Sequence, residues 1–182
     1  MELEESSTES KKSRGLVLVI TGNGKGKSTA GFGVVSRSVG HGYKAAVAQF
    51  IKGKWDCGER NLLVHHDVPF SVMATGFTWE SKDKIADMAA AEKVWNEAKE
   101  YLTNPSYYVV LLDELTYMLS LKYLDTKDVL DTIRNRPVEQ TVIITGRDAL
   151  PELIELADTV SEIKDVKHAF QKGIIARKGI DW

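Results

Sequence analysis

The sequence predicts an α/β protein with a mostly parallel sheet of about six strands and helices on both faces. Short apolar runs alternate with amphipathic stretches from Gly15 onward, which favours strand–helix–strand units. One run, YYVVLL at 107–112, is apolar throughout, as expected of a central strand that is buried on both faces. Such sheets bind ligands beyond the carboxyl ends of their strands. We therefore expect the functional residues in the loops that follow the strands.

The composition is typical of a soluble protein with one domain, which we place at residues 15–182. The 182 residues are enough for a substantial core, and contents of 43% hydrophobic and 27% charged residues are ordinary for a globular protein. A net charge of −2 predicts no general attraction to nucleic acid or to an anionic membrane. No apolar run approaches the ~20 residues of a membrane span, and no signal peptide is recognisable. With a single cysteine, Cys57, we expect a cytoplasmic protein without disulfides.

The segment 1–14 is polar and rich in Glu, Ser and Lys. Because it has few apolar anchors, we expect a flexible tail. The alternative is a segment that a ligand or a partner orders.

The first half of the domain contains three predicted strands and one helix. The run LVLVI at 16–20 is aliphatic, and the helix that follows is bounded by Gly40 and Gly42, which are typical of a helix end. A polar, glycine-containing loop at 51–59 separates the second strand from a helical turn. The elements expected here are strand 16–20, helix 29–39, strand 44–50, a helical turn at 60–64 and strand 69–74.

The second half begins with a long helix at 81–102. Ser81 and Asp83 are candidate caps. A rough apolar stripe supports the helix, formed by Ile85, Met88, Ala89, Val94 and Trp95. The elements expected after it are strand 107–112, helix 126–135, strand 141–145, a short helix from Pro151 and strand 159–163.

The stretch LVLVITGNGKGKST at 16–29 joins the first strand to the first helix through three glycines. Alternate glycines let backbone N–H groups converge on one point, and the helix N-terminus adds its positive dipole end. Lysines add full charge, and a serine hydroxyl can bind Mg²⁺ between phosphates. The sequence therefore predicts a polyphosphate site formed by Gly22, Asn23, Gly24, Lys25, Gly26, Lys27, Ser28 and Thr29.

This loop departs from the common P-loop pattern G-x-x-x-x-G-K-[ST]. Thr21 stands where the first glycine belongs, and Gly22 gives a shorter gap of three residues. Nucleotide binding is expected from the pattern, whereas the pose of the nucleotide is left open.

Two carboxylates, Asp113 and Glu114, directly follow the apolar strand at 107–112. This is the arrangement of a Walker B motif, in which one carboxylate holds Mg²⁺ and the other orients a ligand or accepts a proton. The alternative is an acidic helix N-terminus that the helix dipole stabilises. Because the glycine loop accompanies them, we favour the metal role.

Several cations and aromatic residues are further candidates. Arg147 follows the strand at 141–145, and Lys52 and Lys54 follow the strand at 44–50, so all three can meet a bound anion. Arg37 is equally compatible with a surface arginine and with a phosphate contact. We expect no chemical role for three other residues, because His65 and His66 lack the spacing of a metal site and Cys57 has no partnered base in the sequence.

The segment GFTWE at 76–80 places Phe77 and Trp79 on a loop that follows a glycine. Their spacing does not suit a helix stripe. They are either core anchors or a flat apolar surface for a flat ligand such as a macrocycle, and Trp55 is a weaker case of the same kind.

With these pieces assembled, the chain resembles the ATP:corrinoid adenosyltransferases of the CobA/BtuR type. The likeness covers nearly everything after Gly15. The matching segments are TGNGKGKST, QFIKG followed by Trp55 and Gly58-Glu59-Arg60-Asn61, MATGFTWE, LDELTYM, TVIITGR, LADTVSEI, VKHAF and GID.

The resemblance implies a P-loop NTPase-like (RecA-like) three-layer fold and transfer of the 5′-deoxyadenosyl group of ATP to the Co(I) of a corrinoid, with release of triphosphate. It also implies Mg²⁺ (or Mn²⁺), a homodimer, a flavoprotein electron donor such as a flavodoxin or a flavin reductase, and an N-terminal segment that covers the active site. The reversed ATP pose of this family fits the shortened loop.

By the same resemblance, Lys27 with Phe77 and Trp79 would be catalytic, and the two aromatics would lie against the lower corrin face and displace the axial ligand. Arg37 and Arg147 would contact the nucleotide. Ser28, Asp113 and Glu114 would serve the metal ion. Two alternatives are a P-loop hydrolase or kinase that acts at the γ-phosphate, and a non-catalytic nucleotide or corrinoid carrier.

Overall fold

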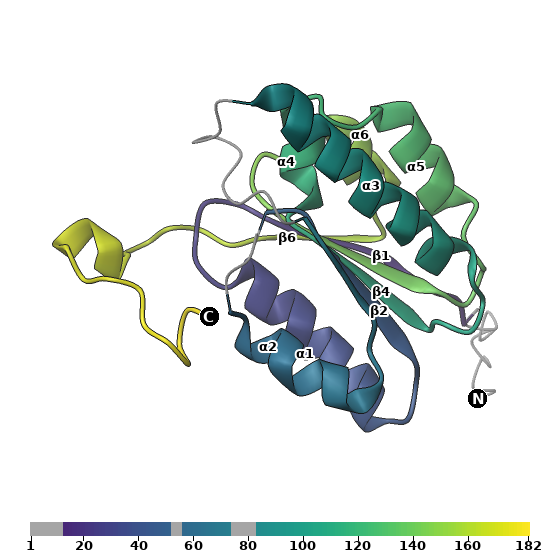
Figure 1. Cartoon of the computed structure of the whole chain (residues 1–182), viewed down its shortest axis with the longest axis horizontal. Coiled ribbons are helices and arrows are strands. Elements are labelled where there is room, and N and C mark those ends of the chain that lie inside the picture. Colours follow the sequence, from purple (N-terminus) through teal and green to yellow (C-terminus); the bar gives the residue numbers. More distant parts are fainter. Residues whose placement is uncertain (1–12, 52–55, 74–82) are drawn as a thin grey trace, which may run out of the picture.

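The computed structural model describes residues 13–51, 56–73 and 83–182. Over these residues the chain forms three layers, with a central sheet between two layers of helices (Figure 1). The sheet has six strands in the order β3-β2-β4-β5-β1-β6, and every neighbouring pair is parallel. The α/β class predicted from the sequence is therefore confirmed.

Each strand begins and ends within two residues of its predicted bounds. Central strands β2 and β4 are buried along their whole length, as the continuous apolar runs predicted, whereas the edge strand β6 is exposed. The strands are β1 Val17–Thr21, β2 Ala45–Gln49, β3 Phe70–Val72, β4 Val109–Asp113, β5 Thr141–Thr145 and β6 Thr159–Glu162.

The helices include one that the sequence did not predict. This helix, α4, directly follows Glu114, and a short 3₁₀ turn at Ala169–Lys172 was also not predicted. No helix of the described residues is both long and apolar enough to cross a membrane. The helices are α1 Lys27–Gly40, α2 Gly58–Leu63, α3 Lys84–Thr103, α4 Leu115–Ser120, α5 Thr126–Arg134 and α6 Pro151–Leu156.

The sheet has an apolar core on each face. Strand β4 shows the division most clearly: Val109 and Leu111 pack with α1 and α2, and Val110 and Leu112 pack with α3, α4 and α5. Alternate residues of a strand face opposite sides, so a fully apolar strand supplies both cores. The two helical layers in Figure 1 cover these two faces.

Helix α3 corrects one expectation. Asp83 caps it as predicted, since its side chain accepts a hydrogen bond from the Ala86 N–H at 3.0 Å. The expected apolar stripe is wrong in its first half, because Ile85, Met88 and Ala89 are exposed. The buried face instead contains Asp87, Ala91, Val94, Trp95, Ala98 and Leu102. At 3.6 residues per turn, Ile85 and Ala89 lie on the side of the helix away from Ala91.

Helix α1 approaches the sheet closely at Gly31. A Cβ atom built on Gly31 would lie 2.9 Å from Leu111 Cδ1 and 3.1 Å from Thr145 Cγ2, and both neighbours are fully buried. Gly33 lies two residues further along α1, and a Cβ atom built on it would have no atom within 4 Å.

We expect Gly31→Val to lower the free energy of unfolding by about 1–3 kcal/mol, because the added methyl groups overpack the contact between α1 and β4–β5. Gly33→Ala on the same helix should be neutral or stabilising by up to about 1 kcal/mol. Urea denaturation followed by circular dichroism measures both. Equal effects of the two substitutions would show that the close approach at Gly31 does not limit packing.

Candidate functional site

A cavity of about 610 Å³ lies over the start of α1, at the carboxyl ends of the strands. Its walls come from the loop after β1, the start of α2, the loops after β4 and β5, and the segment after β6. The lining residues are Asn23, Gly24, Lys25, Gly26, Lys27, Ser28, Thr29, Gly58, Glu59, Leu62, Glu114, Arg147, His168, Gly179, Ile180, Asp181 and Trp182.

The loop between β1 and α1 is held from outside by the chain that continues β6. The Gly24 N–H donates to the Ile163 carbonyl at 2.7 Å, and a Cβ on Gly24 would come within 2.6 Å of the Lys164 carbonyl oxygen. A larger residue would push the loop away from this support.

Helix α1 begins earlier than predicted, at Lys27 instead of Thr29. Its N-cap, Gly26, has a φ of +119°, a conformation that glycine adopts without strain. Ser28 and Thr29 therefore belong to the first turn, where N–H groups without partners in the helix can bind an anion. The positive end of the helix dipole points at the cavity.

The two lysines of the loop have different surroundings. The side chain of Lys27 is buried, and its Nζ donates to the Gly24 carbonyl at 2.8 Å. Burial lowers the pKa of Lys27, and the negative charge of Glu114 opposes this shift. Lys25 is half-exposed, and its Nζ lies 2.6 Å from Asp181 Oδ1.

Asp113 lies behind the cavity, at the end of β4, and is completely buried. Its Oδ2 accepts a hydrogen bond from Gln49 Nε2 at 3.1 Å, and its Oδ1 accepts one from Thr145 Oγ1 at 2.7 Å. The Thr145 hydroxyl oxygen in turn accepts the Glu114 N–H at 2.9 Å. Buried carboxylates require such partners, and here the partners fix the backbone of the next residue.

Glu114 and Arg147 line the cavity beside Lys27. Glu114 has a φ of +62° as the N-cap of α4, a backbone conformation that costs free energy for a residue other than glycine. On the neighbouring loop, Gly146 has a φ of +134°, and a Cβ there would collide with the hydroxyl of Thr116. That hydroxyl donates to the Arg147 carbonyl at 2.6 Å, so the loops after β4 and β5 are tied together.

The predicted site residues divide into three groups. Residues 23–29, Glu114 and Arg147 meet around the cavity, with Gly22 at the start of the same loop. Asp113 lies behind it, and Arg37 is exposed in the last turn of α1 and does not line it. Phe77, Trp79, Lys52, Lys54 and Trp55 lie outside the described residues.

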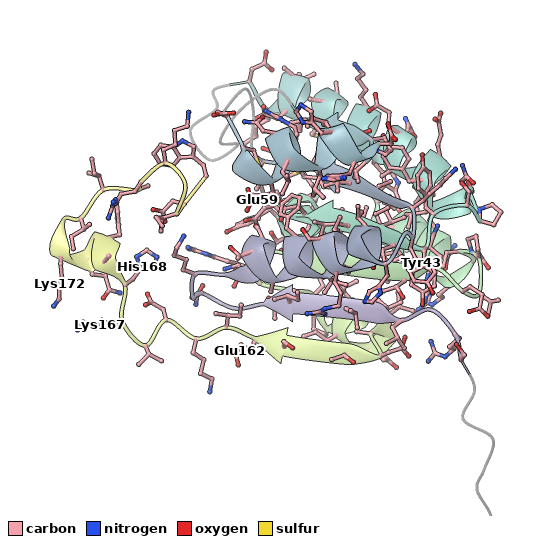
Figure 2. All side chains as sticks on the ribbon, turned by 90° about the horizontal axis from the view of Figure 1, so that it is seen from below. Tyr43, Glu59, Glu162, Lys167, His168 and Lys172 are labelled. Carbon is pink, nitrogen blue, oxygen red and sulfur yellow. The ribbon has the colours of Figure 1, made fainter. Side chains whose placement is uncertain are left out.

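Several lining residues were not predicted. Glu59 and Leu62 come from α2, while His168, Asp181 and Trp182 follow β6. Figure 2 shows Glu59 on the α2 side and His168 on the segment that leaves β6. The motifs GERN, VKHAF and GID contain three of these five residues, Glu59, His168 and Asp181, but nothing in their local pattern indicates a chemical role.

Of the three residues without a predicted chemical role, the structure places two on the surface and gives the third a carboxylate neighbour. His65 and His66 are exposed. Cys57 is buried, and its Sγ donates to Glu59 Oε2 at 3.3 Å.

The donor set fits a magnesium ion that phosphate oxygens help to hold. Within the described ranges, no three His, Cys, Asp or Glu side chains are grouped to hold a metal by themselves. Mg²⁺ commonly uses one or two protein oxygens together with substrate phosphates. The Ser28 hydroxyl and the Glu114 carboxylate, which both line the cavity, satisfy that requirement, whereas the Asp113 carboxylate is occupied by hydrogen bonds from Gln49 and Thr145.

Residues 13–182 match the family model described as ATP:corrinoid adenosyltransferase BtuR/CobO/CobP. The chain is 55% identical over 169 residues to the corrinoid adenosyltransferase of Escherichia coli (strain K12). The aligned region covers 93% of this chain and 86% of that protein. It is 52% identical over 174 residues to the corrinoid adenosyltransferase CobA of Salmonella typhimurium, with coverage of 96% and 89%. For the corrinoid adenosyltransferase of Pseudomonas aeruginosa the identity is 45% over 182 residues.

We expect Thr145→Val to lower the affinity for Mg·ATP by about tenfold, because Glu114 loses the hydroxyl that fixes its backbone. The free energy of unfolding should fall by about 1–3 kcal/mol, because one oxygen of the buried Asp113 loses its partner. Titration calorimetry and urea denaturation measure the two effects.

Thr141→Val is the matched control on the same strand. The Thr141 hydroxyl accepts the Leu16 N–H at 3.2 Å, at the opposite end of β5, so ATP affinity should not change. If Thr145→Val also leaves ATP affinity unchanged, the position of Glu114 does not depend on this hydrogen bond.

Proposed function

Because the chain belongs to the ATP:corrinoid adenosyltransferase family, it adenosylates corrinoids with ATP, and we propose the roles that its residues take. In the proposed step, the electron pair of Co(I) attacks C5′ of ATP and a Co–C bond forms. The C5′–O5′ bond breaks, and its electron pair leaves with the triphosphate. The observation that carries this proposal is the loop at residues 22–29, which offers a positively charged wall for a leaving polyanion.

Stabilisation of the leaving triphosphate is the first task of the site. Positive groups aimed at the charge that develops in the transition state lower the barrier, most of all where water is excluded. The N–H groups at the start of α1 and the buried Nζ of Lys27 are such groups. Lys25 and Arg147 add charge at the sides of the cavity. Lys27 now donates to the Gly24 carbonyl, and we propose that it turns to a phosphate oxygen when ATP binds.

The metal ion is the second element. Ser28 and Glu114 would hold Mg²⁺, or Mn²⁺, together with phosphate oxygens. The ion would neutralise part of the triphosphate charge. In this proposal Asp113 orients Glu114 through Thr145 instead of binding the metal directly, and a nucleotide contact of Arg37 stays a prediction from the resemblance alone.

No side chain needs to be the nucleophile, because reduced cobalt of the substrate supplies the electron pair. The protein must align cobalt with C5′ and keep water away. The buried, hydrogen-bonded thiol of Cys57 is consistent with this division of work.

Reduction of the corrinoid is the third task. We assign Phe77 and Trp79 to the lower corrin face, where they would displace the axial ligand and make Co(II) easier to reduce. Axial ligation and burial both tune the potential of a macrocycle-bound metal. The support is the sequence motif and the family membership, since both residues lie outside the described ranges.

Two partners complete the proposal. A flavoprotein electron donor, such as a flavodoxin or a flavin reductase, would deliver the electron in the cytoplasm. We further propose a homodimer in which residues 1–14 of one copy cover the active site of the other, to be tested by sedimentation and by deletion of residues 1–14. Strongly exposed apolar side chains on the segment after β6, such as Val166, Phe170 and Ile175, support a contact between copies.

We expect ATP and chemically reduced corrinoid to give the absorbance of a Co–C bond together with intact triphosphate in the phosphorus NMR spectrum. Release of orthophosphate or transfer of the γ-phosphate would instead indicate a hydrolase or kinase. Binding of both substrates without any Co–C product would indicate a carrier.

We expect Phe77→Ala and Trp79→Ala to reduce activity that starts from Co(II) by about tenfold or more, because the axial ligand would stay bound and the potential would stay low. Activity with pre-reduced Co(I) should fall much less. Absorbance assays from the two starting states measure this ratio. Equal losses in both assays would assign the two residues to binding or packing in general.

A further inference from the structure

The residues Arg177–Trp182 form a closed turn beside the cavity, which we call the 177–182 turn. The Arg177 N–H donates to Asp181 Oδ2 at 2.7 Å, and the Asp181 N–H returns a bond to the Arg177 carbonyl at 2.8 Å. The Gly179 N–H donates to the Trp182 carbonyl at 2.8 Å. The turn therefore has its own hydrogen-bonded geometry.

This turn connects two walls of the cavity that are far apart in the sequence. Figure 1 shows the yellow segment leaving the body after β6 and curving back toward the start of α2. On one side, Lys178 Nζ lies 3.3 Å from Asp56 Oδ2, and a Cβ on Gly58 would lie 3.8 Å from the Trp182 carbonyl carbon. On the other side, Asp181 contacts Lys25 of the loop after β1.

The contact with Lys25 has two parts. Asp181 Oδ1 lies 2.6 Å from Lys25 Nζ, and the Ile180 carbonyl oxygen lies 3.5 Å from the same nitrogen. An ammonium group has three N–H donors. With two directed at the turn, the third is left for another acceptor, and Lys25 lines the cavity that we assign to the triphosphate.

Charge explains why an acidic residue can occupy this place. A bare carboxylate beside a bound triphosphate would repel it. With the Lys25 ammonium between the two anions, each anion gains a favourable neighbour. Because Asp181 already holds the Lys25 side chain in place, less conformational entropy is lost when the triphosphate binds. Lys25 accordingly holds the pKa of Asp181 below its usual value, with the Arg177 N–H contributing in the same direction.

We propose that the 177–182 turn is a wall of the substrate site and that Asp181 is a positioning residue that orients Lys25 toward the triphosphate of ATP. This inference rests on the proposed function, because it assigns the triphosphate to the loop at residues 22–29. It assigns a specific role to the 177–182 turn, which lies outside the nucleotide-binding motifs of the sequence.

A purely structural role for the ion pair predicts that replacing Asp181 lowers the melting temperature and leaves polyphosphate binding unchanged. Both partners are partly exposed, with side-chain exposures of 46% for Lys25 and 24% for Asp181, and such pairs contribute little to stability. Replacing Asp181 should therefore leave the melting temperature nearly unchanged. Under our proposal, the same replacement weakens the binding of a polyphosphate.

The test uses the full chain and inorganic triphosphate as the probe, measured by titration calorimetry. We expect Asp181→Asn to weaken triphosphate binding by about tenfold, because the Lys25 ammonium loses the carboxylate that orients it, and to raise KM for ATP by a similar factor while kcat changes less. Asp181→Glu should restore part of the affinity. Asp165→Asn is the matched control, because Asp165 follows β6, accepts an exposed hydrogen bond from Gln171 and does not line the cavity.

A double-mutant cycle shows whether the effect passes through Lys25. In a Lys25→Met background, Asp181→Asn should cause little further loss of triphosphate affinity. Unchanged or tighter binding by Asp181→Asn, or the same tenfold loss in the Lys25→Met background, would overturn the proposal. These outcomes differ from a failure of the proposed function, in which the unaltered chain itself forms no Co–C bond.

Discussion

All neighbouring strands of the sheet run in the same direction, and this constraint decides where the candidate site lies. Parallel strands end at one edge of a sheet, and the order β4-β5-β1 makes three of them neighbours. The glycine loop after β1, Glu114 after β4 and Arg147 after β5 are therefore brought around one cavity, although they are far apart in the sequence. The apolar character of β4 and β5 keeps this edge rigid, because both strands are buried on two faces.

A cluster of buried hydrogen bonds around Asp113 lies behind the cavity. The Asp113 carboxylate is removed from water and depends on Gln49 and Thr145 for its hydrogen bonds. Because buried polar groups are costly when a partner is missing, this cluster favours one register between β2, β4 and β5. The same cluster holds the Glu114 backbone. A single set of hydrogen bonds thus specifies both the strand pairing and the position of a residue that lines the cavity.

Much of this arrangement follows from local sequence patterns, and the remainder depends on contacts between distant residues. The strands, the glycine loop and the carboxylates after β4 could be predicted, because apolar runs, glycine spacing and Walker-type pairs are local signals. The partner of Asp113 could not, since Thr145 looks like any strand residue until the two strands are paired. The exposure of Ile85 depends on which side of α3 meets the sheet, and the start of α1 at Lys27 depends on the positive φ of Gly26. Asp181 reaches the cavity only because the segment after β6 turns back.

The support that the chain after β6 gives to the glycine loop also affects folding. β1 lies far in the sequence from its two neighbours in the sheet, β5 and β6, and the Gly24 N–H donates to the carbonyl of Ile163. Pairings between such distant segments form late in folding. The glycine loop therefore acquires its outer support late in folding, when β6 pairs with β1.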